Sequence, residues 1–275
     1  MKNQSPKILI IGIHGPYQPW LEILENGQLK TWMTCKSSSR IINVFGLAMK
    51  SRIKDIDQGL YYLRWSRVKF IAYLSLILEA GLKKLFPIDK YRPNISSQYG
   101  GSTNEIWEVQ MPDSLLLQGV KNVSVFRKSL ELDYDFLVTT ITSSYINVPL
   151  LEDALSQIPP TGFLGGRIEK SGEMEYQQGS FRVYSRDVVA KLVENSHRYK
   201  HWKIEDIAMG DLVSKYYFLF SCLPNYTLES LADVESLTQE DLKNTISYRC
   251  KSSSENKRID SQIMKSLHKR ILSGN

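Results

Sequence analysis

Cysteine is scarce, and the residues present stand apart. Cys35, Cys222 and Cys250 are the only cysteines among 275 residues, and none forms a C-x-x-C pair. Their odd number and wide spacing indicate neither a disulfide scaffold nor a cysteine-based zinc site. We therefore expect the chain in a reducing compartment.

Long apolar runs are missing as well. The run over residues 8–13 is too short for the core of a cleaved signal peptide. The run over residues 70–78 falls far short of the roughly 20 residues of a transmembrane helix, and Glu79 and Lys83 follow it closely. These absences predict a cytoplasmic protein.

Nucleotide-binding fingerprints are absent too. The sequence contains no G-x-G-x-x-G and no Walker pattern, which argues against a dinucleotide-binding fold and a P-loop. Nucleic-acid binding has only the net charge of +6 in its favour, because no aromatic-rich RNA motif or helix-turn-helix occurs. That charge suits any anionic ligand, including a nucleotide diphosphate or an anionic membrane surface.

Strand and helix patterns alternate along the chain. A continuous β-branched run at 7–13, a helical pattern at 20–33 and a strand pattern at 40–46 form a βαβ unit. Further strand patterns lie at 106–109, 136–140, 161–168 and 180–184, and further helix patterns at 114–130, 186–192, 204–216 and 259–272. We predict one α/β domain over residues 1–225, with a mostly parallel central sheet flanked by helices. A C-terminal helical extension, residues 226–275, is expected to pack on it.

One helix pattern has two interpretations. Residues 60–85 place apolar side chains at helical spacing among arginines and lysines. Such a basic amphipathic helix could contact a membrane peripherally, or it could be a core helix with a solvated face. The following segment, residues 87–103, is rich in Pro, Ser, Gly and Asn and is expected to be a loop.

His14 and Gly15 directly follow the first predicted strand. Ligands of open α/β sheets lie beyond the carboxyl ends of the strands, so both residues are candidates to contact a nucleotide. The alternative is a turn that simply needs Gly15 and Pro16.

Two adjacent carboxylates, Glu205 and Asp206, begin the helix pattern that runs to Tyr216. Acids in a first helical turn complement the helix dipole, so stability alone could account for them. A carboxylate can also act as a general base. The spacing by itself leaves both interpretations open.

The stretch Glu205-Asp206-Ile207 with Gly210 resembles the Glu-Asp-Val-x-x-Gly signature of the β-1,3-galactosyltransferase and fringe-like glycosyltransferases. Other matches occur in the same order: Asp135-Phe136-Leu137-Val138 with Tyr145-Ile146-Asn147-Val148-Pro149, then Gly165-Gly166, then residues 179–187, and a weaker match precedes them at 28–32. The resemblance covers residues 108–217. It implies a GT-A-like fold and inverting transfer of a sugar from a nucleotide-sugar, UDP-sugars first, to a glycan or glycolipid hydroxyl.

The resemblance also implies roles for individual residues. Asp206 matches the catalytic base, with Glu205 beside it. The residues implied to contact the acceptor or the sugar are Gly165, Gly166, Gly179, Ser180 and Trp202.

One family motif is absent. Ile141-Thr142-Ser143 aligns with the Asp-x-Asp motif, whose carboxylates are the hard oxygen ligands that a divalent ion needs. The sequence therefore implies a glycosyltransferase without a cofactor such as manganese. The alternative is a non-catalytic nucleotide- or glycan-binding module on the same fold. Thr142 and Ser143 remain candidates to contact the donor.

Cations could stabilise the diphosphate in place of a metal ion. Arg249 and Lys251 are the favoured candidates because they follow a predicted strand, and His268 on the last helix is a third. A merely solvated basic surface is the alternative for each of them.

Overall fold

The computed structural model describes residues 5–63, 92–99, 105–115, 117–171, 174–200, 204–216, 220–252 and 258–273. Trp202 and most of the predicted basic helix at 60–85 lie outside these ranges. No helix in the described ranges has the length and apolar character needed to cross a bilayer.

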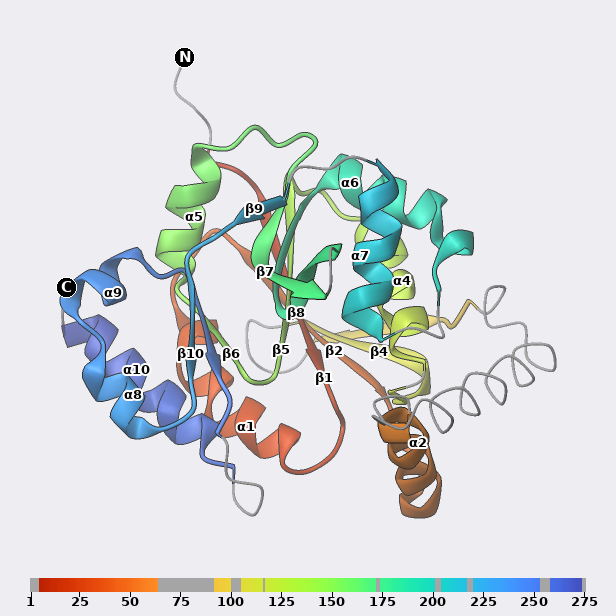
Figure 1. Ribbon diagram of the computed structural model, residues 1–275, viewed down its shortest axis with the longest axis horizontal. Helices are drawn as coiled ribbons and strands as arrows, with labels where there is room; N and C mark the ends of the chain where they lie inside the picture. The colour runs from red at the N-terminus through yellow and green to blue at the C-terminus, as the bar shows by residue number, and fades with distance from the viewer. Residues whose placement is uncertain are drawn as a thin grey trace.

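A mixed central sheet organises the chain (Figure 1). Within the described residues it has eight strands in the order β3-β4-β2-β1-β5-β8-β7-β9. These strands are β1 (Ile8–His14), β2 (Arg40–Leu47), β3 (Ile95–Tyr99), β4 (Glu105–Pro112), β5 (Phe136–Ile141), β7 (Leu164–Ser171), β8 (Met174–Ser185) and β9 (Phe220–Cys222). The run β4-β2-β1-β5 is parallel throughout, while β8 pairs antiparallel with both β5 and β7. The predicted α/β class is confirmed.

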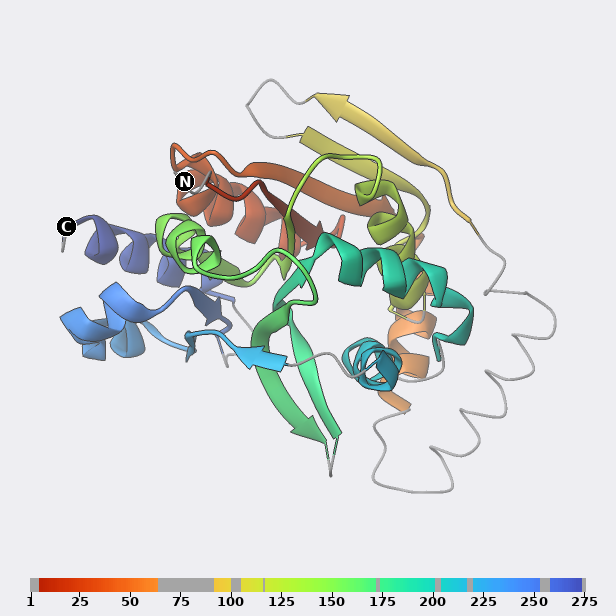
Figure 2. The same cartoon turned by 90° about the horizontal axis from the view of Figure 1, so that it is seen from above.

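Helices cover both faces of this sheet (Figure 2). The helices are α1 (Trp20–Asn26), α2 (Ser51–Leu63), α4 (Gln118–Ser129), α5 (Val148–Ser156), α6 (Arg186–Glu194), α7 (Glu205–Val213), α8 (Leu231–Ser236), α9 (Gln239–Asn244) and α10 (Asp260–Ser273). Side chains of α1, α5 and α10 share one apolar cluster, and side chains of α4, α6 and α7 share another.

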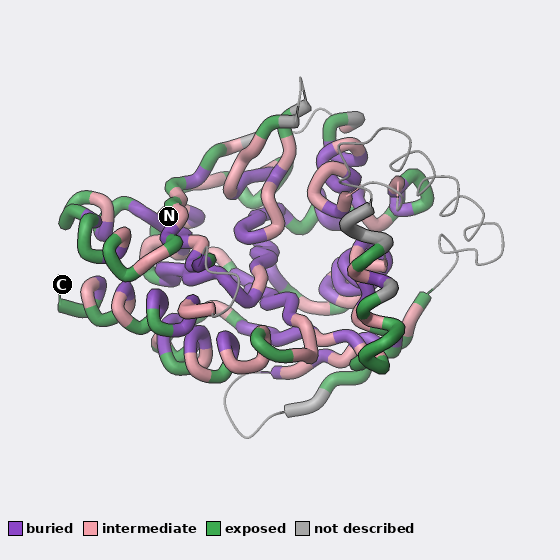
Figure 3. Tube along the Cα trace, turned by 60° about the horizontal axis from the view of Figure 1, so that its bottom comes forward, coloured by how far each residue is buried: buried purple, intermediate pink, exposed green. Residues whose placement is uncertain are grey.

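The first strand shows why its sequence is apolar without a break. Ile8 and Ile10 belong to the cluster under α1, α5 and α10, whereas Leu9 and Ile11 belong to the cluster under α4, α6 and α7. Successive side chains of a strand point to opposite faces, so a strand covered on both sides needs apolar residues at every position. Buried residues accordingly concentrate at the centre of the trace (Figure 3).

A second sheet connects the C-terminal segment to the end of β5. It consists of β10 (Asn225–Leu228), β11 (Ser247–Cys250) and β6 (Ser144–Ile146), in the order β10-β11-β6. Since β6 begins directly after the turn that follows β5, its antiparallel pairing with β11 carries the C-terminal segment to the carboxyl end of β5.

Two expected elements differ in the structure. The predicted helix at 20–33 ends at Asn26, and 3-10 turns follow at Gln28–Lys30 and Trp32–Thr34. Gln28 and Trp32 both donate side-chain hydrogen bonds to the carbonyl of Ser144, at 2.7 and 3.1 Å, so tertiary contacts decide the backbone there. The expected loop at 87–103 contains the edge strand β3, whose polar composition concealed its pairing with β4.

Candidate functional site

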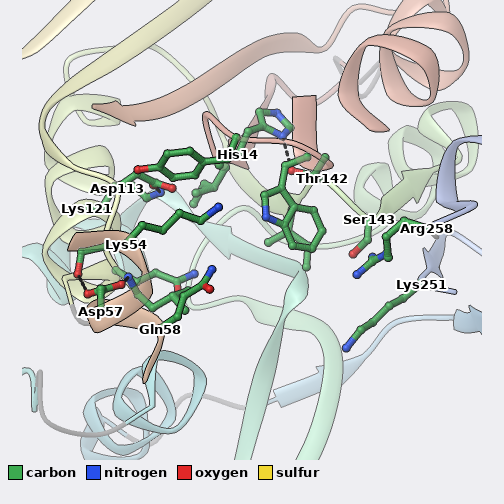
Figure 4. Close-up of a pocket in the computed structure, with 18 of the residues that line it drawn as sticks. His14, Lys54, Asp57, Gln58, Asp113, Lys121, Thr142, Ser143, Lys251 and Arg258 are labelled. Carbon is green, nitrogen blue, oxygen red and sulfur yellow. Dashed lines mark hydrogen bonds and ion pairs between the residues drawn. The ribbon is translucent and has the colours of Figure 1, made fainter. Parts of the chain in front are cut away.

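A cavity of about 330 Å³ opens at the carboxyl ends of β1 and β5 (Figure 4). Segments far apart in the sequence line it: residues after β1, helix α2, the end of β4, the start of α4, the turn after β5, and the C-terminal segment from β11 onward. The cavity brings together His14, Gly15, Thr142, Ser143, Arg249 and Lys251, the predicted donor-binding residues other than His268. This is the edge at which open α/β sheets bind ligands.

His14 is held rigidly at the floor of this cavity. The ring is buried, with Nδ1 at 3.0 Å from Thr142 Oγ1 and Nε2 at 2.9 Å from Asn43 Oδ1. Burial lowers the pKa of His14 to about 4, so the imidazole is neutral at pH 7. Because the oxygen of Asn43 can only accept, Nε2 carries the proton and Nδ1 accepts from the hydroxyl of Thr142. The hydroxyl of Thr142 can still accept a hydrogen bond.

The charge of the cavity is predominantly positive. Its cations are Lys54, Lys121, Arg249, Lys251 and Arg258, and its carboxylates are Asp57 and Asp113. Both carboxylates are already engaged: Asp113 forms an ion pair with Lys121, and Asp57 accepts from the hydroxyl of Ser114 and, at 2.9 Å, from the backbone N–H of Leu115. The remaining cations therefore give the cavity its character as an anion site.

Arg249 forms no ion pair within the described part of the chain, and its buried Nε has no hydrogen-bond partner there. Burial and the nearby charge of Arg167 lower the pKa of Arg249, although Asp206 and Glu169 oppose this shift. Burial and Arg249 lower the pKa of Lys251. Both shifts are those of cations that are partly desolvated near other cations, and a bound phosphate would oppose them.

Backbone pairing positions Arg249. It lies opposite Ser144 in the antiparallel register of β11 with β6, and the following residue, Cys250, donates its N–H to the carbonyl of Ser143 at 2.7 Å. The guanidinium is thereby tied to the turn that carries Thr142 and Ser143.

Arg182 on β8 holds the two carboxylates at the start of α7. Its guanidinium binds Glu205 bidentately, at 2.8 and 2.6 Å, and also donates to Oδ1 of Asp206. Asn122 donates to Glu205 at 2.7 Å. Glu205 is thus enclosed by partners, whereas the side chain of Asp206 stays 30% exposed.

The two carboxyl groups ionise differently. Burial opposes the charge on Glu205, but Arg182 outweighs it and lowers the pKa of Glu205. Burial raises the pKa of Asp206 to about 7, with the adjacent carboxylate of Glu205 adding to the rise and Arg182 opposing it. Glu205 is therefore a fixed structural charge, and Asp206 is the group that can gain or lose a proton near neutral pH.

Asp206 lies beside the cavity and is not part of its lining. Its Oδ1 accepts from the backbone N–H of Gly179 at 3.1 Å. The carbonyl of the next residue, Ser180, accepts from Thr140 and Ser144 at 3.0 and 2.7 Å, next to the turn that lines the cavity. The charge of Asp206 also acts on Arg249 and raises the pKa of Arg249.

The predicted sugar-contacting glycines serve close backbone packing. A Cβ on Gly166, whose φ is +131°, would lie 2.3 Å from the carbonyl oxygen of Phe181, and one on Gly165 would meet the ring of Phe163 at 2.6 Å. Gly179 differs, because a Cβ there would lie 3.0 Å from Oδ1 of Asp206. The hydroxyl of Ser180 donates to Gln178 Oε1 at 2.6 Å. Gly179 and Ser180 thus lie next to the base candidate.

The structure does not place His268 in this cavity. His268 lines a separate cavity with Cys35 and Leu242, and its Nδ1 lies 2.8 Å from the hydroxyl of Tyr145. Its helix, α10, packs against α1. Helical periodicity alone could not place this face.

The turn after β5 does not suit a divalent ion. Ile141 offers no side-chain oxygen, and the hydroxyl of Thr142 is a neutral ligand already bonded to His14. Across the part of the chain that the structure describes, no three His, Cys, Asp or Glu side chains come together as metal ligands.

Several site residues had no assigned role from sequence. Arg182 lies within the matched stretch 179–187, but its bond to the acidic pair depends on the register of β8. Lys54, Lys121 and Arg258 join the cavity through tertiary packing, and no local pattern distinguishes them from surface cations.

Two solved structures resemble the chain as a whole. The glycosyltransferase GlyE of Streptococcus pneumoniae matches with a TM-score of 0.45 and 9% identity over 98% of this chain and 62% of that one. Mouse xyloside xylosyltransferase 1, in its apo form, matches with a TM-score of 0.38 and 10% identity over 89% and 97%. The chain therefore spans less than two thirds of the GlyE structure. No protein-family model and no curated protein matches the sequence. At such low similarity, neither likeness decides the activity of this chain.

Proposed function

We propose that this chain is an inverting glycosyltransferase that moves a sugar from a nucleotide-sugar donor to a hydroxyl of a glycan or glycolipid. One observation carries the proposal: Asp206, whose pKa is about 7, lies beside a cationic cavity in which Arg249 forms no ion pair within the described part of the chain. Sugar transfer from a nucleotide-sugar uses a proton acceptor next to a site for the anionic leaving group.

The diphosphate of the donor would occupy the cavity between the C-terminal cations and the turn after β5. Arg249 and Lys251 would bind phosphate oxygens with charge-assisted hydrogen bonds, and Ser143 offers a hydroxyl on the same wall. The volume of about 330 Å³ lies within the range of small-molecule sites. We take a UDP-sugar as the first donor to test, on the resemblance to the fringe-like enzymes.

The proposed reaction is a single displacement. Asp206 accepts the proton of the acceptor hydroxyl while the hydroxyl oxygen forms a bond to the anomeric carbon. The bond from that carbon to the diphosphate oxygen breaks, and the nucleoside diphosphate leaves with the electron pair. Arg249 and Lys251 stabilise the charge that develops on the leaving group. The anomeric configuration is inverted because the hydroxyl oxygen attacks on the face opposite the departing diphosphate.

Metal independence is part of the proposal. It is supported by the neutral side chains of the turn after β5 and by the cations that face them. Calorimetric titration with UDP is expected to give the same affinity in excess EDTA as in the presence of manganese. Binding that requires manganese would refute this part.

A glycolipid acceptor would place the enzyme at a membrane surface. A cytoplasmic enzyme acting on a glycolipid would contact a membrane peripherally, and the basic segment 60–85 suits an anionic surface by its charge. Co-sedimentation with anionic vesicles that is lost at high salt is the expected result, and equal binding to neutral vesicles would contradict it.

The experiment for the function is a thermal-shift screen of nucleoside diphosphates followed by their sugar conjugates. A ligand that binds the folded state raises the melting temperature, so UDP or a close relative should do so and adenosine should not. Binding of the diphosphate without turnover of any conjugate would favour the non-catalytic binding module.

A further inference from the structure

Arg182, Glu205 and Asp206 form an ion cluster with unequal numbers of charges. Arg182 is 2% exposed and contacts both carboxyl groups, and Glu205 is 8% exposed. Two carboxylates therefore share a single guanidinium within the cluster. In a poorly solvated site, a second carboxylate beside the first is penalised, so one of the two holds a proton more readily.

The geometry decides which carboxyl that is. Glu205 receives the bidentate fork of Arg182 and the amide of Asn122, so its ionised form is satisfied on both oxygens. Asp206 accepts from Arg182 and from the Gly179 N–H, and both of these bonds end on Oδ1. The more exposed and less satisfied carboxyl, Asp206, is thus the one that takes up the proton.

Within the part of the chain that the structure describes, four further titratable groups act on Asp206. They are Tyr176 and Tyr184 from β8, Tyr199 from the segment before α7, and Arg249 from β11. Burial raises the pKa of all three tyrosines, so they stay neutral at pH 7. Arg249 acts from the cavity side without a hydrogen bond to Asp206 in the described chain.

We propose that Glu205 and Arg182 together set the proton affinity of Asp206. Arg182 is the positioning residue that fixes Oδ1 of Asp206. Glu205 supplies the neighbouring negative charge that keeps Asp206 a competent base. The cluster would thereby make sugar transfer rise with pH through the neutral range. This inference rests on the proposed function for its catalytic consequence, while the cluster can be measured without turnover.

The experiment titrates Asp206 by NMR in the full chain labelled with ¹³C at the aspartate carboxyls. The Asp206→Asn protein identifies its signal. We expect a midpoint of about 7 for the unmodified chain. In Glu205→Gln the like charge is removed while Asp206 keeps Arg182, so the midpoint should fall by about one unit or more.

A second variant tests the positioning role. Lysine in Arg182→Lys keeps one charge but cannot bind both carboxyl groups as a fork, so the Asp206 midpoint should rise. In a turnover assay, this variant should lose kcat with little change in the KM for donor, and its pH profile should move with the midpoint. Glu131→Gln, which removes an exposed carboxylate paired with Lys128, is the matched control and should leave the midpoint unchanged.

The two readouts separate the possible failures. Midpoints that are the same in the unmodified chain, Glu205→Gln and Arg182→Lys would overturn the inference, whatever the activity. Shifted midpoints in a protein that turns over no donor would support the cluster and count against the proposed function instead.

Discussion

Arg249 lies directly opposite Ser144 in the pairing of β11 with β6, which places a C-terminal guanidinium at the turn after β5. The same turn carries Ile141-Thr142-Ser143, which offers no carboxylate. The pairing therefore puts a permanent positive charge beside this turn. This relationship motivates the first prediction.

Arg249→Ala is expected to weaken UDP binding roughly 10- to 100-fold, because a hydrogen bond to a charged group contributes about 1.5–3 kcal/mol. Calorimetry measures the affinity, and urea unfolding should show little change, since Nε of Arg249 has no partner in the described chain. Lys251→Ala should weaken binding less, because its side chain is more exposed. Lys265→Ala, which removes a cation from another cavity, is the control. Equal affinities in all variants would contradict the proposed role of Arg249 and Lys251 in binding the diphosphate.

Sequence patterns were sufficient for the apolar framework and insufficient for the site. The continuous β-branched run at 7–13 predicted a strand, because the pattern lies within neighbouring residues. The positions of Arg249 and His268 depend on nonlocal contacts. Arg249 depends on the register of β11, and His268 depends on the packing of α10 on α1. No window of neighbouring residues contains that information, so one of these two predictions matched the cavity and the other did not.

The acidic pair shows a second limit. Both acids were placed at the start of α7 from helical spacing, and the structure has α7 begin at Glu205. Which of the two carboxyl groups stays ionised depends on Arg182, which is more than 20 positions earlier in the chain. A buried ion pair of this kind leaves no periodic signal in the sequence.

Gly166→Ala should destabilise the fold by about 2 kcal/mol or more, because φ is +131° and the new Cβ would meet the carbonyl oxygen of Phe181 at 2.3 Å. Gly162→Ala is the matched control: φ is +66° but no atom lies within 4 Å, so only the conformational cost of about 1 kcal/mol applies. Urea unfolding compares the two. Equal losses would show that backbone packing at Gly166 is unimportant.

His14 should make the protein sensitive to acid. Its pKa falls from 6.5 to about 4 on folding, so the unfolded chain binds the proton first. The stability associated with neutral His14 is full above pH 6.5 and is lost as the pH falls towards 4, by up to about 1.4 kcal/mol per unit. Urea unfolding at pH 7 and pH 5 should show a shallower loss for His14→Gln than for the unmodified chain. His197→Gln, at an exposed position, should retain the full slope, and a full slope in His14→Gln would contradict the assignment.

Asp206 should affect stability in the opposite direction. Its pKa rises from 3.8 to about 7 on folding, so the folded state holds the proton more tightly. This contribution is full below pH 3.8 and is lost as the pH rises through about 7. Asp206→Asn removes the ionised carboxylate and is expected to gain about 1 kcal/mol relative to the unmodified chain at pH 8. Urea unfolding at pH 5 and pH 8 measures the loss of stability in each protein. The same loss in Asp206→Asn as in the unmodified chain would contradict this.

The central claim is that Asp206 accepts the proton in sugar transfer. The most direct measurement is the rate of nucleoside diphosphate release from a panel of nucleotide-sugars, UDP-sugars first, by the unmodified chain and by Asp206→Asn. Asparagine keeps the size of the side chain but cannot accept a proton at neutral pH. The account predicts release by the unmodified chain, a fall of roughly 10²-fold or more in the variant and little change in UDP affinity. Equal release by the two proteins, or none from any donor by the unmodified chain, would contradict it.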